Sequence, residues 1–353
     1  MFGKAHVRDS FSPLLQSENS MFGRMPSVKR ALLSSCIFVF LCSPVAAQQR
    51  VGVLASFTGD WVAYGQAYRR GIELADVGSK ASFIYEDDGF LPARSVSAFR
   101  KLVEVDKISG VLVGDTVTAQ AIAPIALKHK IPLLAWASGT KFPNNPYALR
   151  LWTSNAKDFS FMAGEIKRRG YKKLALFTST HTYTTEWARA LTEQFPQSVW
   201  EDFSTNPDSF QASILKAKAG GFDAIGVCLA AGLNGRFARQ LRSLRVDIPL
   251  IGCNFIEASA DIEAAAGAFD GVWFTAPRLS PEFVRSYTAH HGRSDHVVSA
   301  AVFHDAALLV TGTIDKPFAI AGLREVNVDG DRHLDFDYQV LRFRGSQIVT
   351  DPG

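Results

Sequence analysis

The chain has 353 residues, of which 47% are hydrophobic and 20% are charged, a composition that supports a sizeable folded core. Its formal net charge is +4, but the first 47 residues hold five basic and two acidic side chains, so the rest of the chain is close to neutral. This balance excludes any argument from charge for a nucleic-acid or membrane-surface partner, and we expect neither.

Residues 25–47 have the pattern of a secretory signal. Lys29 and Arg30 precede an apolar run from Ala31 to Leu41, and small residues end the segment at Val45-Ala46-Ala47. The run is too short for a stable transmembrane helix, and no later stretch reaches the roughly 18 apolar residues that a membrane span needs. We therefore expect residues 1–47 to be a cleavable signal with an upstream extension.

Strands and helices alternate through the first half of the mature chain. The strands are expected at 51–56, 82–85, 111–113 and 131–136, and the helices at 61–75, 93–106 and about 116–129. The strands are continuous apolar runs, which is typical of parallel strands covered on both faces.

A second series begins after the apolar run 148–152 and repeats the scheme. Strands are expected at 174–177, 199–203, 224–229, 250–252 and 271–275, with helices at 157–169, 183–195, 208–219, 234–244 and 258–266. Helices at 281–290 and 297–311 and a late strand at 336–342 follow.

This alternation predicts an α/β fold of two doubly wound parallel-sheet lobes with a cleft between them. The chain is expected to cross between lobes near 150–153, near 275–277 and after Lys316, which makes a multi-strand hinge. We assign 48–151 and 277–320 to lobe 1, and 152–276 and 321–353 to lobe 2.

Polar residues follow two neighbouring strands, at the carboxyl ends that face the crevice of such a sheet. Their hydroxyls and the free N–H groups of a helix start suit a carboxylate or another acceptor, although Ser and Thr also serve as simple helix caps. Asp115 could cap the following helix or bind a cation. The candidate ligand contacts are Asp115, Thr116 and Thr118 after the first strand, and Trp136, Ala137, Ser138 and Thr140 around the end of the second.

Aromatic residues near strand ends could be core residues or walls of the cleft. They include Trp61, Tyr64, Trp136, Tyr183 and Phe255. Tyr64 and Tyr183 begin helices that start from strand ends, so we expect both to line the cleft, as in small-molecule sites that combine apolar walls with a few polar groups.

No catalytic motif is present. The sequence contains no G-x-S-x-G, Walker loop, G-x-G-x-x-G or H-E-x-x-H, and the strand-end clusters hold no catalytic base. We expect a binding protein without catalytic residues, metal site or cofactor.

Taken together, these segments resemble the type I periplasmic solute-binding proteins of ABC importers, in particular the branched-chain amino acid class. The resemblance covers nearly the whole mature chain and rests on F-T-G-D-W-V-A-Y-G at 57–65, Y-E-D-D at 85–88, V-G-D-T-V-T-A-Q at 113–120, I-P-L-L-A-W-A-S-G-T at 131–140 and Y-T-T-E-W-A at 183–188. It implies a periplasmic location, a small-molecule ligand and an ABC permease in the inner membrane as partner; we expect a monomer.

The resemblance also implies roles for individual residues. Thr118, Ala137, Ser138 and Thr140 fall on positions that hold the ligand carboxylate, and Tyr64 and Tyr183 match aromatic walls. This chain departs from the family pattern elsewhere: Asn254 stands near the glutamate that grips the ligand ammonium, Ala230 replaces an aromatic wall and Trp136 replaces a proline. We therefore expect a small polar or carboxylate-bearing ligand other than a standard branched-chain amino acid, with Asn254 offering a hydrogen bond.

Two other functions remain open. A secreted sensor on the same fold could report ligand to a membrane receptor, and an enzyme is possible because doubly wound folds host many chemistries.

Cys228 and Cys253 lie near the ends of neighbouring expected strands, so a disulfide is possible in an oxidising compartment. We favour two buried free thiols.

Overall fold

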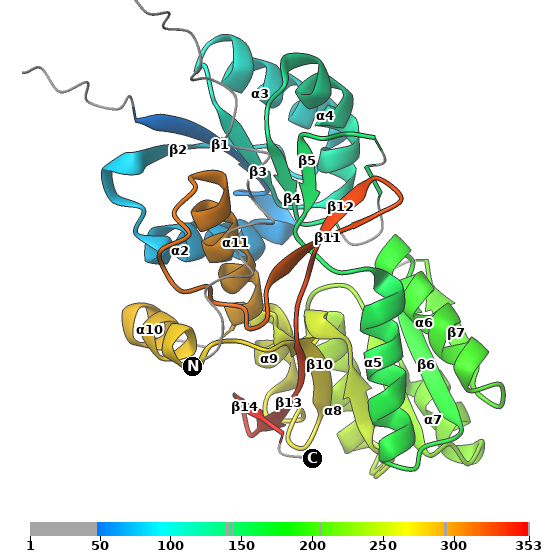
Figure 1. Ribbon diagram of the computed structural model, residues 1–353. Helices are drawn as coiled ribbons and strands as arrows, with labels where there is room; N and C mark the ends of the chain where they lie inside the picture. Colours follow the sequence, from blue (N-terminus) through cyan, green and yellow to red (C-terminus); the bar gives the residue numbers. More distant parts are fainter. Residues whose placement is uncertain (1–47, 138–140, 143, 205–206, 293–294, 352–353) are drawn as a thin grey trace, which may run out of the picture.

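The computed structural model describes residues 48–137, 141–142, 144–204, 207–292 and 295–351. The expected signal at 1–47, and Ser138 and Thr140, lie outside these ranges. Among the residues that are described, none of the helices combines the length and the apolar character needed to cross a membrane. The described chain forms two lobes, each built on a seven-stranded sheet with helices on both faces, which confirms the predicted fold class (Figure 1).

The first lobe is built on the sheet β11-β12-β5-β4-β3-β1-β2. Its parallel strands are β1 (Gln49–Ala55), β2 (Ala81–Asp87), β3 (Gly110–Val113), β4 (Leu133–Ala135), β5 (Ala148–Arg150) and β12 (Asp331–Asp335), and β11 (Arg324–Val328) is antiparallel at the edge. Every residue of β3, β4 and β5 is buried, as expected for continuous apolar runs between two helical layers.

Two helical layers cover the first sheet. The helices are α2 (Val62–Ala75), α3 (Pro92–Glu104), α4 (Thr116–His129), α10 (Pro281–His291) and α11 (Val297–Val310), with short 3-10 turns η2 (Gly59–Trp61) and η3 (Gly78–Lys80). Helices α3 and α4 share one apolar cluster that includes Phe99 and Ile122. Helices α2 and α11 cover the other face, where Tyr68 stacks on Phe303 with ring centroids 3.9 Å apart.

The second lobe repeats the arrangement in the sheet β14-β13-β10-β9-β8-β6-β7. Its parallel strands are β6 (Leu174–Ser179), β7 (Val199–Phe203), β8 (Ala224–Cys228), β9 (Leu250–Gly252) and β10 (Trp273–Pro277), and β13 (Tyr338–Arg344) and β14 (Gln347–Thr350) are antiparallel. The helices are α5 (Asn155–Arg168), α6 (Thr182–Gln194), α7 (Gln211–Ala219), α8 (Leu233–Ser243) and α9 (Ser259–Ala265), and η4 (Asn254–Glu257) follows β9.

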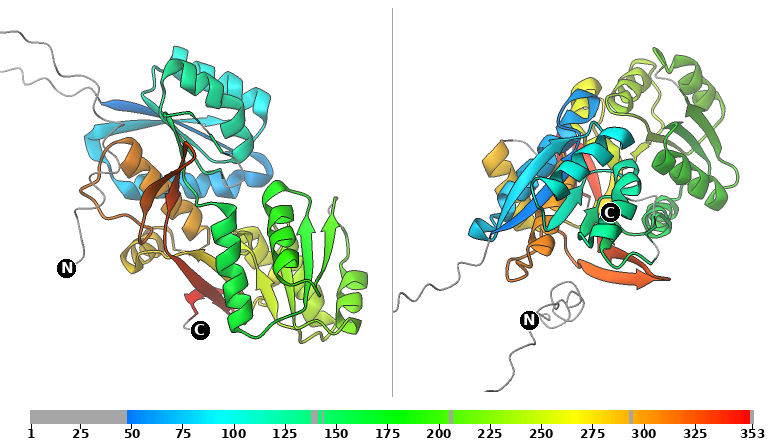
Figure 2. Two further views of the ribbon diagram at one scale, coloured as in Figure 1. Left: turned by 45° about the vertical axis from the view of Figure 1, so that its right-hand side comes forward. Right: turned by 90° about the horizontal axis from the view of Figure 1, so that it is seen from above.

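The last crossing between lobes differs from the prediction. Strands β11 and β12 belong to the first sheet and only β13 and β14 to the second, so the chain crosses at Phe336–Asp337 and not near residue 320. A buried ion pair of 2.6 Å between Arg150 and Asp331 ties β12 to β5. The β11–β12 hairpin is rich in charged residues, so its sequence carries no signal for either sheet. Strand β13, in red, runs on into the second lobe in Figures 1 and 2.

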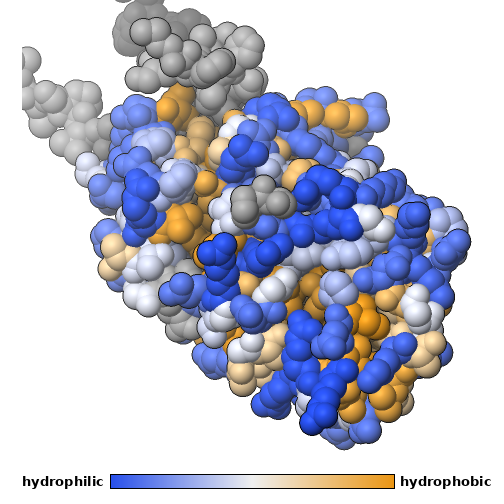
Figure 3. Space-filling model, turned by 90° about the horizontal axis from the view of Figure 1, so that it is seen from below, coloured by the Kyte–Doolittle hydropathy of each residue, from blue (hydrophilic) through white to orange (hydrophobic). Residues whose placement is uncertain are grey.

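Most large apolar side chains are buried in the cores of the two lobes and along their junction. Figure 3 shows one face of the molecule on which polar and charged side chains, in blue, surround separate apolar areas. Large apolar residues that are exposed among the described residues come from both lobes: Leu91, Val105, Val117, Leu127, Val199, Trp200, Leu215 and Val328.

Candidate functional site

A cavity of about 240 Å³ lies between the two lobes. Residues that follow the carboxyl ends of β3, β4, β6 and β9 line it, as the strand order predicts. The first lobe contributes Trp61, Tyr64, Tyr68, Phe90, Gly114, Asp115, Thr116, Val117 and Trp136, the second contributes His181, Tyr183, Asn254 and Phe255, and Trp152 lies where the chain crosses.

Aromatic rings make most of the wall and hold one another in place. Trp136 lies 5.7 Å from Tyr68 and 5.6 Å from Trp152 between ring centroids, and Trp61 lies 5.6 Å from Tyr64. The Tyr68 hydroxyl donates a hydrogen bond of 3.0 Å to the carbonyl oxygen of Gly114. These contacts limit the rotamers of the rings and so stabilise the apolar wall of the first lobe.

Asp115 is the acidic group of the cavity. It is the N-cap of α4, and its Oδ1 accepts hydrogen bonds from the backbone N–H groups of Val117 at 2.7 Å and Thr118 at 3.1 Å. Its Oδ2 is buried and accepts no hydrogen bond from any described residue. Burial raises the pKa of Asp115, with a smaller contribution from the nearby Asp88, and hydrogen bonds from Thr118 and Val117 oppose the shift.

Two residues expected to hold the ligand do not lie on the cavity wall. The Thr118 side chain is fully buried; its hydroxyl donates to Asp88 Oδ2 at 2.7 Å and lies 3.0 Å from Ser95 Oγ. Ala137 is buried in the cluster between α3, α4 and the sheet. The backbone turns both side chains toward α3, away from the crevice. Ser138 and Thr140 fall outside the described residues.

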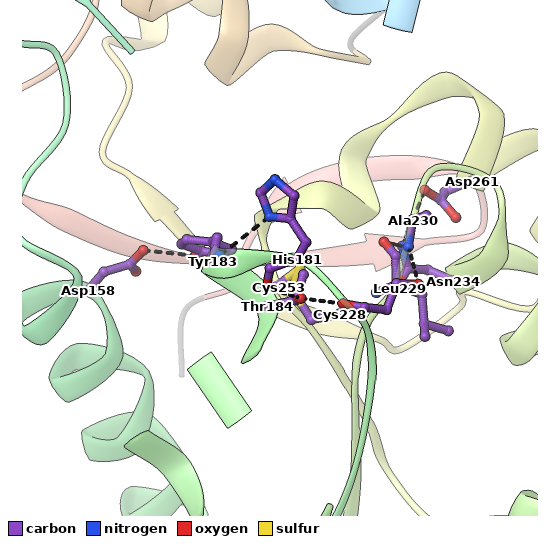
Figure 4. The surroundings of a disulfide bond; sticks show 11 residues. Asp158, His181, Tyr183, Thr184, Cys228, Leu229, Ala230, Asn234, Cys253 and Asp261 are labelled. Atoms are coloured by element: carbon purple, nitrogen blue, oxygen red, sulfur yellow. Dashed lines mark hydrogen bonds between the residues drawn. A yellow bond between two sulfur atoms is a disulfide. The ribbon is translucent and has the colours of Figure 1, made fainter. Parts of the chain in front are cut away.

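The second lobe presents His181 from the turn between β6 and α6, and Tyr183 from the first turn of α6 (Figure 4). His181 is the N-cap of α6, and its Nδ1 accepts from the backbone N–H of Tyr183 at 3.3 Å, so Nε2 carries the proton of the neutral ring. Burial lowers the pKa of His181, which favours that neutral form. The Tyr183 hydroxyl donates to Asp158 Oδ2 at 3.0 Å, and burial raises the pKa of Asp158 to about 6.

A disulfide joins Cys228 and Cys253, which corrects the expectation of two free thiols. Val227 pairs with Gly252 in the parallel register of β8 and β9, so the residues that follow them, Cys228 and Cys253, are also neighbours. Their Cα atoms lie 5.3 Å apart, within the range of a disulfide. Both cysteines are buried in the apolar cluster that includes Tyr183 (Figure 4), and Cys253 directly precedes Asn254. The bond therefore ties two strand ends together beneath the second-lobe wall of the cavity.

Asn254 and Phe255 open η4 after this disulfide. Phe255 lies 5.4 Å from Tyr183 between ring centroids, and the two rings form the wall of the second lobe. The Asn254 side chain offers a buried Oδ1 that has no hydrogen-bond partner among the described residues. Asn254 and Asp115 line the cavity from different lobes.

Sequence reasoning missed several cavity residues. Tyr68 lies within the expected helix 61–75, Phe90 stands in the turn after β2, and Trp152 falls at an expected crossing between lobes. The position of Trp152 at an expected crossing was a usable signal, because a residue there must lie beside the cleft. Tyr68 and Phe90 carried no such signal, because no local sequence pattern indicates which aromatic core residue borders a cavity. No group of His, Cys, Asp and Glu within the described ranges is arranged to hold a metal ion.

Comparisons with known proteins agree with this geometry. Residues 48–337 match the model of a family described as periplasmic binding protein. Among solved structures, a leucine-binding protein from Thermotoga maritima is 18% identical with a TM-score of 0.71, and the match covers 86% of this chain and 97% of that one. An isoleucine complex of a branched-chain amino acid transporter binding protein from Streptococcus pneumoniae is 18% identical, with a TM-score of 0.70 and coverage of 86% and 100%.

A solute-binding protein of an ABC transporter from R. palustris, solved with benzoate, is 20% identical with a TM-score of 0.68, and covers 86% of this chain and 95% of its own. A search of curated proteins found no match. The family match spans both lobes and the cavity between them, and this chain belongs to the type I periplasmic binding proteins.

Proposed function

We propose that this protein captures a small organic solute between its two lobes in the periplasm and delivers it to an ABC permease of the inner membrane. The observation that carries the proposal is the cavity itself, which both lobes line at the carboxyl ends of their strands. Three crossings join the lobes, so a solute that contacts both walls shifts the balance between open and closed forms.

The contacts that we propose for the solute come from both lobes. Tyr64, Thr116 and Trp136 stand on one wall, and Tyr183 and Asn254 stand on the other. Asp115 and Phe255 complete the set. We keep Ser138 and Thr140 as proposed contacts from their position after β4.

The lining of the cavity argues for a solute other than a standard branched-chain amino acid. Eight of the lining residues are Trp, Tyr or Phe, which suits a ring or another bulky apolar body better than a short aliphatic side chain. The neighbour solved with benzoate supports the view that this fold accepts an aromatic solute.

Small-angle scattering on the mature protein tests capture. A solute found by thermal-shift screening across amines, carboxylates, amides and amino acids should decrease the radius of gyration at saturation. Trp136→Ala should weaken binding of that solute by roughly tenfold or more, because it removes a large wall ring. Unchanged dimensions at saturation would contradict closure on the solute.

A further inference from the structure

We propose that the solute held in this cavity is a small organic cation, an ammonium compound, and not a carboxylate. The inference rests on the proposed function, since it names the class of solute that the same site takes.

The first observation is an excess of buried acceptors that lack donors. Asp115 Oδ2 from the first lobe and Asn254 Oδ1 from the second are both buried, and no described residue donates a hydrogen bond to either. Buried polar atoms in folded proteins almost always have partners. An ammonium or another N–H donor between the lobes would bring donors to these two side chains, whereas a carboxylate would bring only further acceptors.

The second observation concerns the two helix starts that face the cavity. Free N–H groups at such starts are the usual anchor for an anion. In this protein Asp115 occupies the start of α4 through the N–H groups of Val117 and Thr118, and His181 occupies the start of α6 through that of Tyr183. The protein's own side chains thus take donors that would hold a carboxylate.

The third observation is the charge around the cavity. No lysine or arginine is among its described lining residues. Two cations near the crossings are engaged in ion pairs, Arg150 with Asp331 and Lys157 with Asp335. A bound carboxylate would meet Asp115 with no countercharge. Burial already raises the pKa of Asp115, so a bound cation would relieve the cost of keeping that carboxylate ionised.

The aromatic wall completes the inference. Trp61, Tyr64 and Trp136 line the cavity from the same lobe as Asp115, Tyr183 and Phe255 line it from the other lobe, and Trp152 lines it at a crossing. Faces of aromatic rings attract cations, and cages of such rings bind quaternary ammonium groups. Rings together with one carboxylate are the two elements that recognise an organic ammonium.

Matched probes test the charge of the solute directly. Choline is paired with its uncharged carbon analogue 3,3-dimethylbutan-1-ol, and 2-phenylethylamine with 2-phenylethanol, while benzoate and isoleucine represent carboxylates. Titration calorimetry and the fluorescence of the cavity tryptophans report binding. We expect the ammonium member of at least one pair to bind at least tenfold more tightly than its neutral partner, and more tightly than either carboxylate.

Asp115→Asn separates the charge from the fold. Asn is as good an N-cap as Asp, so α4 keeps its cap while the charge is lost. We expect roughly tenfold to hundredfold weaker binding of the ammonium probe, with little change for the neutral one. Asp87→Asn is the matched control, because Asp87, like Asp115, accepts a backbone N–H hydrogen bond at a strand end, but it lies outside the described cavity lining.

Tighter binding of benzoate or isoleucine than of either ammonium would overturn the cationic class, and so would equal binding of both members of each pair or no binding of the ammonium probes. Carboxylate binding with compaction in scattering would leave solute capture standing. Ammonium binding without compaction would instead contradict capture between the lobes and leave the class intact.

Discussion

At the scale of single residues, Asp115 and Thr118 lie close together in the sequence but have different surroundings. They are three positions apart, yet Asp115 borders the cavity while Thr118 points into the first lobe. The Thr118 hydroxyl supports the buried carboxylate of Asp88, which also accepts from Ser95. The turn thus places one acid on the cavity wall and supports a second acid inside the first lobe.

Thr118→Val should lower the free energy of unfolding by about 1–3 kcal/mol, because it leaves the buried Asp88 carboxylate with one donor fewer. Urea denaturation measures the loss. Thr116→Val is the contrasting variant, since Thr116 lines the cavity: it should change solute affinity more than stability. A loss of affinity without a loss of stability in Thr118→Val would show that Thr118 contacts the solute after all.

At the scale of elements, the contact between α2 and α11 depends on a glycine. A Cβ at Gly71 would overlap the backbone carbonyl of Ala300, so the two helices can approach this closely only without a side chain there. Helix α11 is buried along nearly its whole length, which explains why its sequence is apolar on every face.

Gly71→Ala should therefore destabilise the protein by about 1–3 kcal/mol. The added Cβ would meet the backbone of Ala300, which cannot move aside as the end of a flexible side chain could. Gly164→Ala is the matched control within α5: its Cβ meets open space, and the higher helix propensity of Ala should stabilise by about 0.5–1 kcal/mol. Thermal and urea unfolding of the two variants measure these opposite changes in the free energy of unfolding. Equal effects would contradict close packing at Gly71.

The disulfide belongs to the same scale, because it joins the ends of β8 and β9 across 25 positions of sequence. Replacing both Cys228 and Cys253 by Ala should lower stability by about 2–4 kcal/mol, since the unfolded chain gains freedom. Reductant should destabilise the native protein to a similar extent and leave the double variant unaffected. An unmodified protein that shows two free thiols after unfolding without reductant would refute the bond.

At the scale of the whole molecule, Glu257 links the lobes. It ends η4 in the second lobe, and its carboxyl accepts from the backbone N–H groups of Val298 and Ser299 at the start of α11 in the first. Burial raises the pKa of Glu257 from 4.5 to about 8, with the nearby Asp295 adding to the shift. The folded protein thus keeps a proton there that the unfolded chain releases.

The free energy of unfolding should therefore fall as the pH rises from about 4.5 to about 8, by an amount on the order of a few kcal/mol from this group. Below this window both states hold the proton, and above it both have lost it. Glu257→Gln should flatten the slope, whereas Glu263→Gln, at an exposed position of α9, should not. Buried Asp261 has a pKa raised to about 7 and contributes in the same direction. A slope that Glu257→Gln leaves unchanged would contradict the assignment.

Features that depend on local sequence patterns could be predicted from the sequence, and features that depend on contacts between distant residues could not. Continuous apolar runs that alternate with helical segments are local patterns. They were therefore enough to predict the two lobes, the strand ends that face the cleft, and Tyr64 and Asp115 near those ends. The β11–β12 hairpin was missed because charged edge strands lack such a pattern, and its place follows from the pairing of Arg150 with Asp331 across 181 positions.

The sequence by itself determined the α/β repeat, the candidate loops and the absence of recognisable catalytic motifs, because each follows from residue order within a few turns of chain. Only the tertiary structure decided that Cys228 and Cys253 are bonded, that Thr118 and Ala137 are buried in the first lobe, and that Asp115 and Asn254 line one cavity from different lobes. Those outcomes depend on strand register and on the packing of the two lobes. Both are set by contacts between residues that are far apart in the sequence.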